Sequence, residues 1–287
     1  MPNFFCIAFF LALSIFVNAS ASGVSDQDKI LWLNFDIAPG GISSGPFKAQ
    51  GIGYQFYKTY KEVLPEYQHS FIYANVARMR KIIESPQNSC IVYIFHLPEY
   101  TKYRHWGPIN YIAPPNRIVT TPKMAKYFSS KKPSLAALLD DSSLRLGVMT
   151  GRAYRVPEIL KANKDNPNII TAYSSSRNVY RMLDAGRLDY TLGDWVEVDF
   201  LEKTLGVETS FITFPMKEDT GYKENYVSCT GNKWGKTIVD KLHRHFSSLA
   251  KYESEVLPSI IKWIRPVDQV EYKQNYMKQV NNYLISK

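Results

Sequence analysis

Cysteine is scarce in this sequence: Cys6, Cys90 and Cys229 are the only three in 287 residues. None of them has a second cysteine at the Cys-x-x-Cys spacing of common zinc and thiol-redox sites. His243 and His245 are two residues apart on a predicted helix, so they point to different faces and cannot form an i, i+4 metal pair. We therefore expect a protein that is not an enzyme and that has no metal, cofactor or catalytic residues.

Long apolar runs are also few. Residues 4–17 form one block, FFCIAFFLALSIFV, and the following Ala19-Ser20-Ala21 has the small-x-small form of a signal-peptidase site. The block is shorter than the about 18 residues that a membrane span needs, and no later segment approaches that length. No Lys or Arg precedes the block, although signal peptides usually have such a flank. We expect residues 1–21 to be a signal peptide cleaved near Ala21, with export to the periplasm; an uncleaved anchor is the alternative.

Runs of basic residues are absent, although the formal net charge is +9. The Lys and Arg residues are scattered, so the sequence does not indicate nucleic-acid binding. The charge is compatible with anionic ligands or envelope surfaces, and a generally basic surface is the simpler interpretation. The 45% hydrophobic content and the length suffice for two domains with real cores.

The most informative stretch runs from Leu144 to Leu201. Apolar runs at 144–149, 169–173 and 189–194 alternate with helical patterns at 154–163 and 177–185, which predicts a β-α-β-α-β lobe with a largely parallel sheet. Turns that follow parallel strands gather at the carboxyl edge of the sheet. Gly151-Arg152 and Asp194 should therefore lie near one another.

A similar pattern occurs earlier in the chain. Residues 30–35, 67–73 and 89–95 predict strands, and 51–65 and 76–85 predict helices, with a Gly-, Ser- and Pro-rich loop at 36–50 that is able to line a site. The two patterns predict two similar α/β lobes, joined by crossings at 109–121 and about 208–217. Beyond residue 234 the sequence predicts helices that brace the first lobe and the hinge.

These segments resemble family 3 of the bacterial extracellular solute-binding proteins. The resemblance rests on GxGY at Gly51–Tyr54, on NVARMRKI, on Arg-x-Trp-Gly-Pro at 104–108, on LGVMTG and on LDAGRLDYTLGD, and it covers nearly all of the chain after residue 21. It implies a two-lobed periplasmic binding protein-like type II fold, each lobe a mainly parallel sheet flanked by helices, with two hinge crossings. The implied division is a signal peptide at 1–21, a first lobe at 22–116 and 213–287, and a second lobe at 117–212.

The resemblance also implies a function. Such proteins capture a small polar, amino-acid-like solute in the cleft between the lobes, act as monomers, and deliver it to an ABC transporter or a membrane receptor. A sensory role without transport is one alternative. A second is a dehydratase-like enzyme of the same fold, for which Glu99, His96 or Asp194 would be the acid or base.

The resemblance also implies ligand contacts by position. Arg104, in the Thr-x-x-Arg segment that begins at Thr101, matches the arginine that clamps a ligand carboxylate. Thr150, Gly151 and Arg152 match the turn that offers N–H groups, with Arg152 in place of the usual small polar residue. That arginine either receives a second acidic group of the ligand or points to solvent.

Asp194 matches the acidic residue that binds the ligand ammonium, and an N-cap of the helix that begins at Trp195 is its alternative role. Trp32, Phe35 and Trp106 fall at loops that face the cleft and are candidate walls, with a core position as the alternative for each. Trp195 is a further candidate wall from the second lobe.

Cys90 and Cys229 remain after removal of residues 1–21, and both fall on segments assigned to the same lobe. In an oxidising compartment they either form a disulfide that closes a loop of about 140 residues or stay as two buried thiols.

Overall fold

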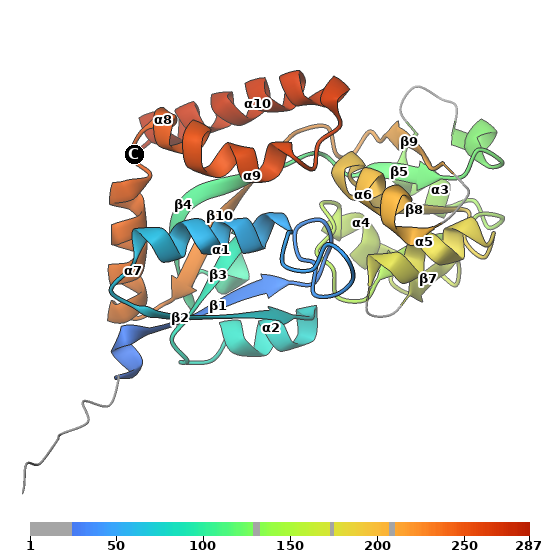
Figure 1. The fold of residues 1–287 in the computed structure, drawn as a ribbon. Coiled ribbons are helices and arrows are strands. Elements are labelled where there is room, and N and C mark those ends of the chain that lie inside the picture. Colours follow the sequence, from blue (N-terminus) through green and yellow to red (C-terminus); the bar gives the residue numbers. More distant parts are fainter. Residues whose placement is uncertain (1–24, 129–132, 173–174, 207–209) are drawn as a thin grey trace, which may run out of the picture.

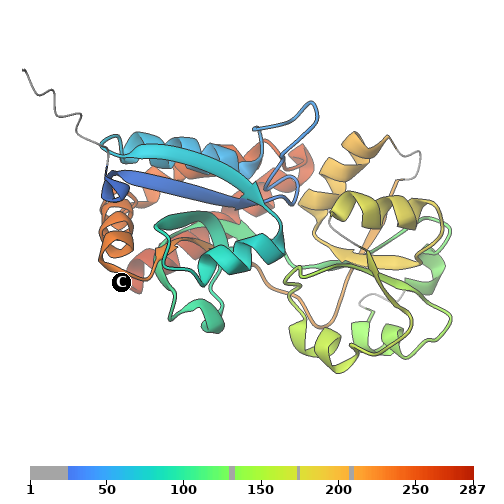
Figure 2. The same ribbon diagram turned by 90° about the horizontal axis from the view of Figure 1, so that it is seen from below.

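The structure is a computed structural model that describes residues 25–128, 133–172, 175–206 and 210–287. The predicted signal peptide lies outside the described residues. Two α/β lobes lie side by side, each built on its own five-stranded sheet (Figures 1 and 2). The prediction of a two-lobed α/β fold is confirmed. Within the described chain no helix is long and apolar enough to cross a bilayer.

The first lobe contains the sheet with strand order β2-β1-β3-β10-β4. Its strands are β1 (Lys29–Phe35), β2 (Gln68–Ala74), β3 (Ser89–Phe95), β4 (Arg104–Ala113) and β10 (Lys223–Thr230). The helices are α1 (Ile52–Val63), α2 (Val76–Ile83), α7 (Lys233–His245), α8 (Leu249–Lys251), α9 (Leu257–Ile261) and α10 (Pro266–Ile285), with a π-helical turn at Tyr252–Val256 and short 3₁₀ turns at Asp26–Asp28 and Pro98–Tyr100.

The second lobe contains the sheet with strand order β7-β6-β8-β5-β9. Its strands are β5 (Arg117–Thr120), β6 (Leu146–Met149), β7 (Ile169–Ala172), β8 (Tyr190–Gly193) and β9 (Ile212–Pro215). The helices are α3 (Leu135–Leu139), α4 (Pro157–Ala162), α5 (Ser176–Asp184) and α6 (Trp195–Leu205), with a 3₁₀ turn at Ala125–Phe128.

Helix boundaries follow local signals in the sequence. Helix α1 buries Ile52, Phe56 and Tyr60, which are spaced by four residues and form one face of the helix. Helix α2 begins after Asn75, whose side chain accepts a hydrogen bond from the Arg78 N–H at 2.9 Å. Helix α6 ends at Gly206, which has a φ of +66° and forms the left-handed cap that glycine tolerates best.

Both sheets are mixed rather than mainly parallel. β1 pairs in parallel with β2 and β3, but β10 is antiparallel to both β3 and β4. In the second sheet β6 pairs in parallel with β7 and β8, whereas β5 is antiparallel to β8 and β9. The cause is the double crossing: the chain leaves the first lobe along β4 and returns along the adjacent β10, so these two strands run in opposite directions.

The crossings lie at 114–116 and 216–222, between β4 and β5 and between β9 and β10. The expected second boundary after residue 212 therefore falls inside β9, which pairs with β5 in the second sheet. The C-terminal helices pack against the first lobe, as Figure 1 shows for α9 and α10. The hydroxyl groups of Tyr272 and Tyr276 donate to the backbone carbonyls of Ile112 at 2.9 Å and Asn110 at 3.1 Å, so α10 supports the strand that leads into the first crossing.

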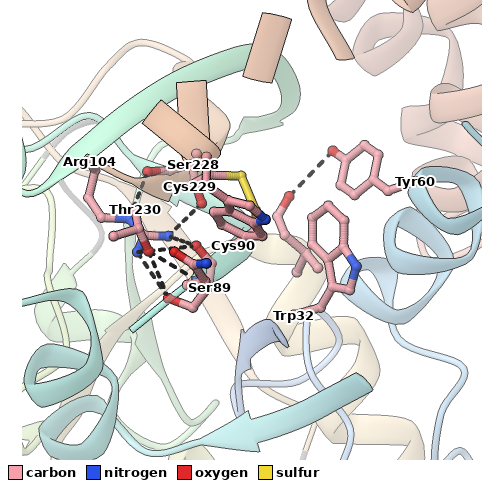
Figure 3. Close-up of a disulfide and its surroundings, with 12 residues drawn as sticks. Trp32, Tyr60, Ser89, Cys90, Arg104, Ser228, Cys229 and Thr230 are labelled. Carbon is pink, nitrogen blue, oxygen red and sulfur yellow. Dashed lines mark hydrogen bonds between the residues drawn. A yellow bond between two sulfur atoms is a disulfide. The ribbon is translucent and has the colours of Figure 1, made fainter. Parts of the chain in front are cut away.

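Cys90 and Cys229 form a disulfide between the adjacent strands β3 and β10 (Figure 3). Both are fully buried in the core of the first lobe. The bond joins two parts of the first lobe that are separated in the sequence by the entire second lobe.

Candidate functional site

A cavity of about 370 Å³ lies between the two lobes. The first lobe contributes the loop after β1, the carboxyl end of β3, helix α2 and part of β4, and the second lobe contributes the turn after β6 and the start of α6. Four residues predicted for the site line it: Phe35, Gly151, Arg152 and Asp194. They meet because each follows or ends a strand that points toward the other lobe.

Asp194 is the N-cap of α6. Its carboxylate accepts a hydrogen bond from the Glu197 N–H at 2.9 Å, so the predicted capping role is confirmed. Burial, followed by the negative charge of Glu197, raises the pKa of Asp194 to about 6, while hydrogen bonds from backbone N–H groups and the charge of Arg152 lower it.

The side chain of Arg152 does not point to solvent, because it is paired with an acidic residue of the protein. Its two terminal nitrogens donate to the two carboxylate oxygens of Glu197 at 2.7 and 2.8 Å, and the side chains are only 12% and 2% exposed. Burial lowers the pKa of Arg152, but the charges of Glu197, Tyr154 and Asp194 and the hydrogen bonds to Glu197 together raise it more, so the net direction is upward. This bidentate pair closes one wall of the cavity.

Gly151 has a φ of +73°, a conformation that favours glycine. A methyl group at this position would lie 3.2 Å from Val76 Cγ1 of helix α2, in the other lobe. Thr150, in the same turn, is exposed and is not among the residues that line the cavity.

We expect Gly151→Ala to lower the free energy of unfolding by about 1 to 2 kcal/mol, the cost of placing a Cβ in the left-handed region, and to weaken solute binding because the methyl group holds the lobes apart. Gly186→Ala is the matched control, since Gly186 has a φ of +66° but open space around its Cβ position. Chemical denaturation and solute titration of both variants check this. Equal loss of solute affinity in the two would contradict the interlobe explanation.

The raised pKa of Asp194 makes stability depend on pH. The folded state binds the Asp194 proton more tightly than the unfolded state, so the free energy of unfolding should fall as pH rises from about 4 to about 6. Asp194→Asn keeps an oxygen for the cap and removes the charge, so we expect it to be more stable than wild type at pH 7, by at most about 3 kcal/mol at 1.36 kcal/mol per pKa unit, and equal near pH 4.

Denaturation of both proteins across this pH range measures the difference, and a variant less stable than wild type at pH 7 would contradict it. Burial is the main cause that raises the pKa of Asp199, also to about 6. Its contribution to the pH dependence is the same in both proteins and cancels in the difference between them. The charges of Glu197 and Arg152 shift the pKa of Asp194. The charge of Asp194 in turn shifts the pKa values of Tyr93, Tyr111, Arg155, Tyr180 and Tyr272.

Arg104 lies elsewhere. It is 3% exposed beside the disulfide, and its guanidinium donates to the side chains of Ser89, Ser228 and Thr230 and to the carbonyls of Ser89 and Ser228 (Figure 3). Burial lowers its pKa to about 9. Arg104 is opposite Thr230 in the sheet, and Ser89 is the first residue of β3, whereas the carboxyl end of β3 lines the cavity. The seven residues of β3 span about 20 Å, which separates Arg104 from the cleft.

Two of the three predicted aromatic walls, Trp32 and Trp106, pack within the first lobe, Trp32 fully buried and Trp106 half-buried. Trp32 is fully buried, stacks on Tyr60 and donates its indole N–H to His69 Nδ1 at 2.9 Å. Trp106 packs against His96 with ring centroids 4.4 Å apart and is not a lining residue. Of the three predicted walls, only Phe35 lines the cavity. Trp195 is buried and packs against Tyr272.

The structure adds lining residues that the sequence patterns did not single out, chiefly Tyr93, Tyr111, Arg155, Glu197 and Asn225. Arg155 connects the two crossings: it donates to the carbonyls of Ala113 at 3.1 Å, Pro114 at 2.9 Å and Gly221, and it forms an ion pair with Asp219 at 2.8 Å. In the sequence, only its position in the segment that follows β6 indicates a place near the cleft.

A hydrolase-like motif occurs in the loop after β1. Gly41-Ile42-Ser43-Ser44-Gly45 has the Gly-x-Ser-x-Gly spacing of serine hydrolases. The Ser43 hydroxyl donates to Asp36 at 2.6 Å and the Ser43 N–H donates to the same carboxylate at 3.2 Å. The hydrogen bonds from Ser43 to Asp36 thus stabilise the loop. The nucleophile of a catalytic triad requires a hydrogen bond to a histidine, and Ser43 does not form one with any histidine of the described residues. No group of three or more potential metal ligands occurs in the described part of the chain.

Neither a protein-family profile nor the sequence of a curated protein matches this chain. Solved structures do match. An ABC uptake transporter substrate-binding protein of Streptococcus pneumoniae with bound histidine has a TM-score of 0.62 at 16% identity, over 83% of this chain and 94% of that one. An ancestral arginine-binding protein bound to arginine has a TM-score of 0.61 at 14% identity, over 84% of this chain and 100% of that one.

A third similar structure is a domain of a sensor. The periplasmic VFT2 domain of BvgS from Bordetella pertussis has a TM-score of 0.56 at 13% identity, over 83% of this chain and 94% of that one. The chain therefore has the two-lobed fold that substrate-binding proteins of amino-acid ABC transporters share with periplasmic sensor domains.

Proposed function

We propose that this protein captures a small, amino-acid-like solute reversibly in the cavity between its lobes. The observation that supports this most directly is the cavity itself, which both lobes line, with Asp194 from one lobe and aromatic side chains from the other. Hinge motion at the two crossings would open and close it, and a ligand that contacts both lobes favours the closed state.

We further propose that the protein acts in the periplasm as a monomer and that a membrane transporter reads its closed state. The apolar block at residues 4–17 and the disulfide support export to an oxidising compartment. The similar solved structures include both transport proteins and sensor domains, so a receptor is the second candidate partner. Loss of solute uptake after deletion of the gene is expected for transport, and unchanged uptake would favour the receptor.

The test is thermal unfolding of the processed protein, refolded to remove carried-over solute, against amino acids, amines, dicarboxylates and small peptides. A solute that binds only the folded state raises the melting temperature, and at 100 times Kd it adds about 2.7 kcal/mol of stability. A shift confined to one chemical class is the expected result. No shift with any member of the panel would contradict a binding function.

A further inference from the structure

Most charges around the cavity cancel in pairs. Arg152 is bound by Glu197 through two hydrogen bonds. Arg155 is balanced by Asp219, and its remaining terminal N–H groups go to backbone carbonyls at the crossings. Arg80 and Glu99 also line the cavity, but both are exposed and of opposite sign. Among the described residues, each guanidinium in the interior of the cavity is thus already paired with a protein carboxylate, and Arg104 is fully engaged at the other end of the first sheet.

Among the described residues, Asp194 is the lining acid of this interior that forms no ion pair. The charges of Arg152 and Arg155 act on it, but both guanidinium groups are paired with other carboxylates. The Asp194 carboxylate accepts a hydrogen bond from the backbone N–H of Glu197. With the pairs cancelled, the interior has a net charge of −1 when Asp194 is ionised. A monocation would neutralise it, whereas a zwitterion would leave the same net charge in a site of low dielectric, where an uncompensated charge is costly.

Two aromatic rings, those of Tyr93 and Tyr111, line the same cavity as Asp194. Burial, followed by the charge of Asp194, raises the pKa values of both phenols. The two rings are 5.7 Å apart between centroids, edge to face. Tyrosine faces attract ammonium groups through their quadrupole, so these rings complement the carboxylate in a cation site.

The rest of the wall in the first lobe is apolar. Helix α2 contributes Val76, Met79 and Ile83, and the end of β3 and the residues after it contribute Ile94 and Leu97. Further apolar lining residues of this lobe are Phe35, Ile37, Pro39 and Ile52. Burial against such walls favours binding of a ligand with a large apolar group, whereas a polar side chain would find no hydrogen-bond partner there.

Two buried donors at the cavity, Arg155 Nε and Asn225 Nδ2, have no hydrogen-bond partner among the described residues. Because Asp219 already balances the charge of Arg155, these donors suit a neutral acceptor such as a hydroxyl, a carbonyl or a water better than a second carboxylate.

Resting on the proposed function, we infer that the solute is a monocationic amine with a large apolar body, bound through its ammonium group at Asp194 and not clamped through a carboxylate. The inferred solute has the size of an amino acid, as in the proposed function, but the site does not recognise a carboxylate on it.

Matched pairs of ligands test this in the processed full chain. We expect 2-phenylethylamine to bind at least as tightly as phenylalanine, and 3-methylbutylamine at least as tightly as leucine, in calorimetric titrations. We expect no binding of 3-phenylpropionate, which keeps the ring and carboxylate and lacks the amine. Asp194→Asn should weaken amine binding at least about tenfold, since a hydrogen bond to a charged group is lost, whereas Glu158→Gln, an exposed acid on α4 of the same lobe, should change it less than twofold.

The outcomes separate this inference from the proposed function. An amino acid that binds ten times more tightly than its amine would show that the carboxylate is recognised, and it would overturn the inference alone. Binding of arginine, histidine or glutamate without either amine would do the same. Unchanged amine affinity in Asp194→Asn, in a variant with the wild-type circular dichroism spectrum, would remove Asp194 from the site. Absence of binding by every compound would instead contradict the binding function.

Discussion

Replacement of both cysteines, Cys90→Ala with Cys229→Ala, is expected to lower the free energy of unfolding by about 5 kcal/mol, the chain-entropy value for a loop of this length. The two cysteines are 139 residues apart in the sequence, and the loop between them contains the whole second lobe. Without the bond, the unfolded chain regains the freedom to separate the two halves of the first lobe. Urea denaturation monitored by tryptophan fluorescence measures the loss.

Reduction of the wild-type protein gives a second measure of the same bond without any change in side-chain volume. Dithiothreitol should destabilise the wild type by a similar amount and leave the double-alanine variant unaffected, because the latter has no bond to break. Wild-type stability that is the same with and without dithiothreitol would contradict the assignment. Arg104 hydrogen-bonds to Ser89, Ser228 and Thr230, which adjoin the two cysteines in sequence, so it helps to hold the same strand junction.

The architecture was predictable because it depends on local patterns. Strand-length apolar runs alternate with helical runs twice in the sequence, and capping residues such as Asn75 and Asp194 mark helix starts. The return crossing was placed too early, because β9 is only four residues long and its pairing with β5 is a long-range contact. The mixed sheets have the same origin, since strand direction beside a crossing depends on the route of the whole chain.

The site was predictable only where a residue follows a strand that ends at the cleft. This rule applies to Phe35, Gly151, Arg152 and Asp194, which line the cavity. It fails for Arg104, because residues 98–103 lead the chain back to the start of the sheet before β4 begins. The partner of Arg152, 45 residues away on α6, is a tertiary contact that no spacing reveals.

Glu197→Ala is expected to lower the free energy of unfolding by about 3 to 5 kcal/mol, because removal of one partner of a buried pair leaves the other charge unpaired. Arg152 is 12% exposed and Glu197 is 2% exposed, so water cannot replace the lost contact well. Denaturation of Glu197→Ala, Arg152→Met and the double variant forms a thermodynamic cycle. The double variant should recover much of the loss, since apolar groups then replace both charges.

Single variants of the same pair also test the charge of the cavity. Glu197→Gln leaves Arg152 with an uncompensated positive charge, which changes the net charge of the interior from −1 to 0 and should weaken the binding of an amine at Asp194. Arg152→Met has the opposite effect on charge, since it leaves Glu197 and Asp194 both negative, and a monocation should then bind more tightly if the variant folds. Equal amine affinities in the two variants would mean that the pair does not govern the charge at the solute site. If Glu197→Ala lowers the free energy of unfolding by less than about 1 kcal/mol, the ion pair is not formed in solution.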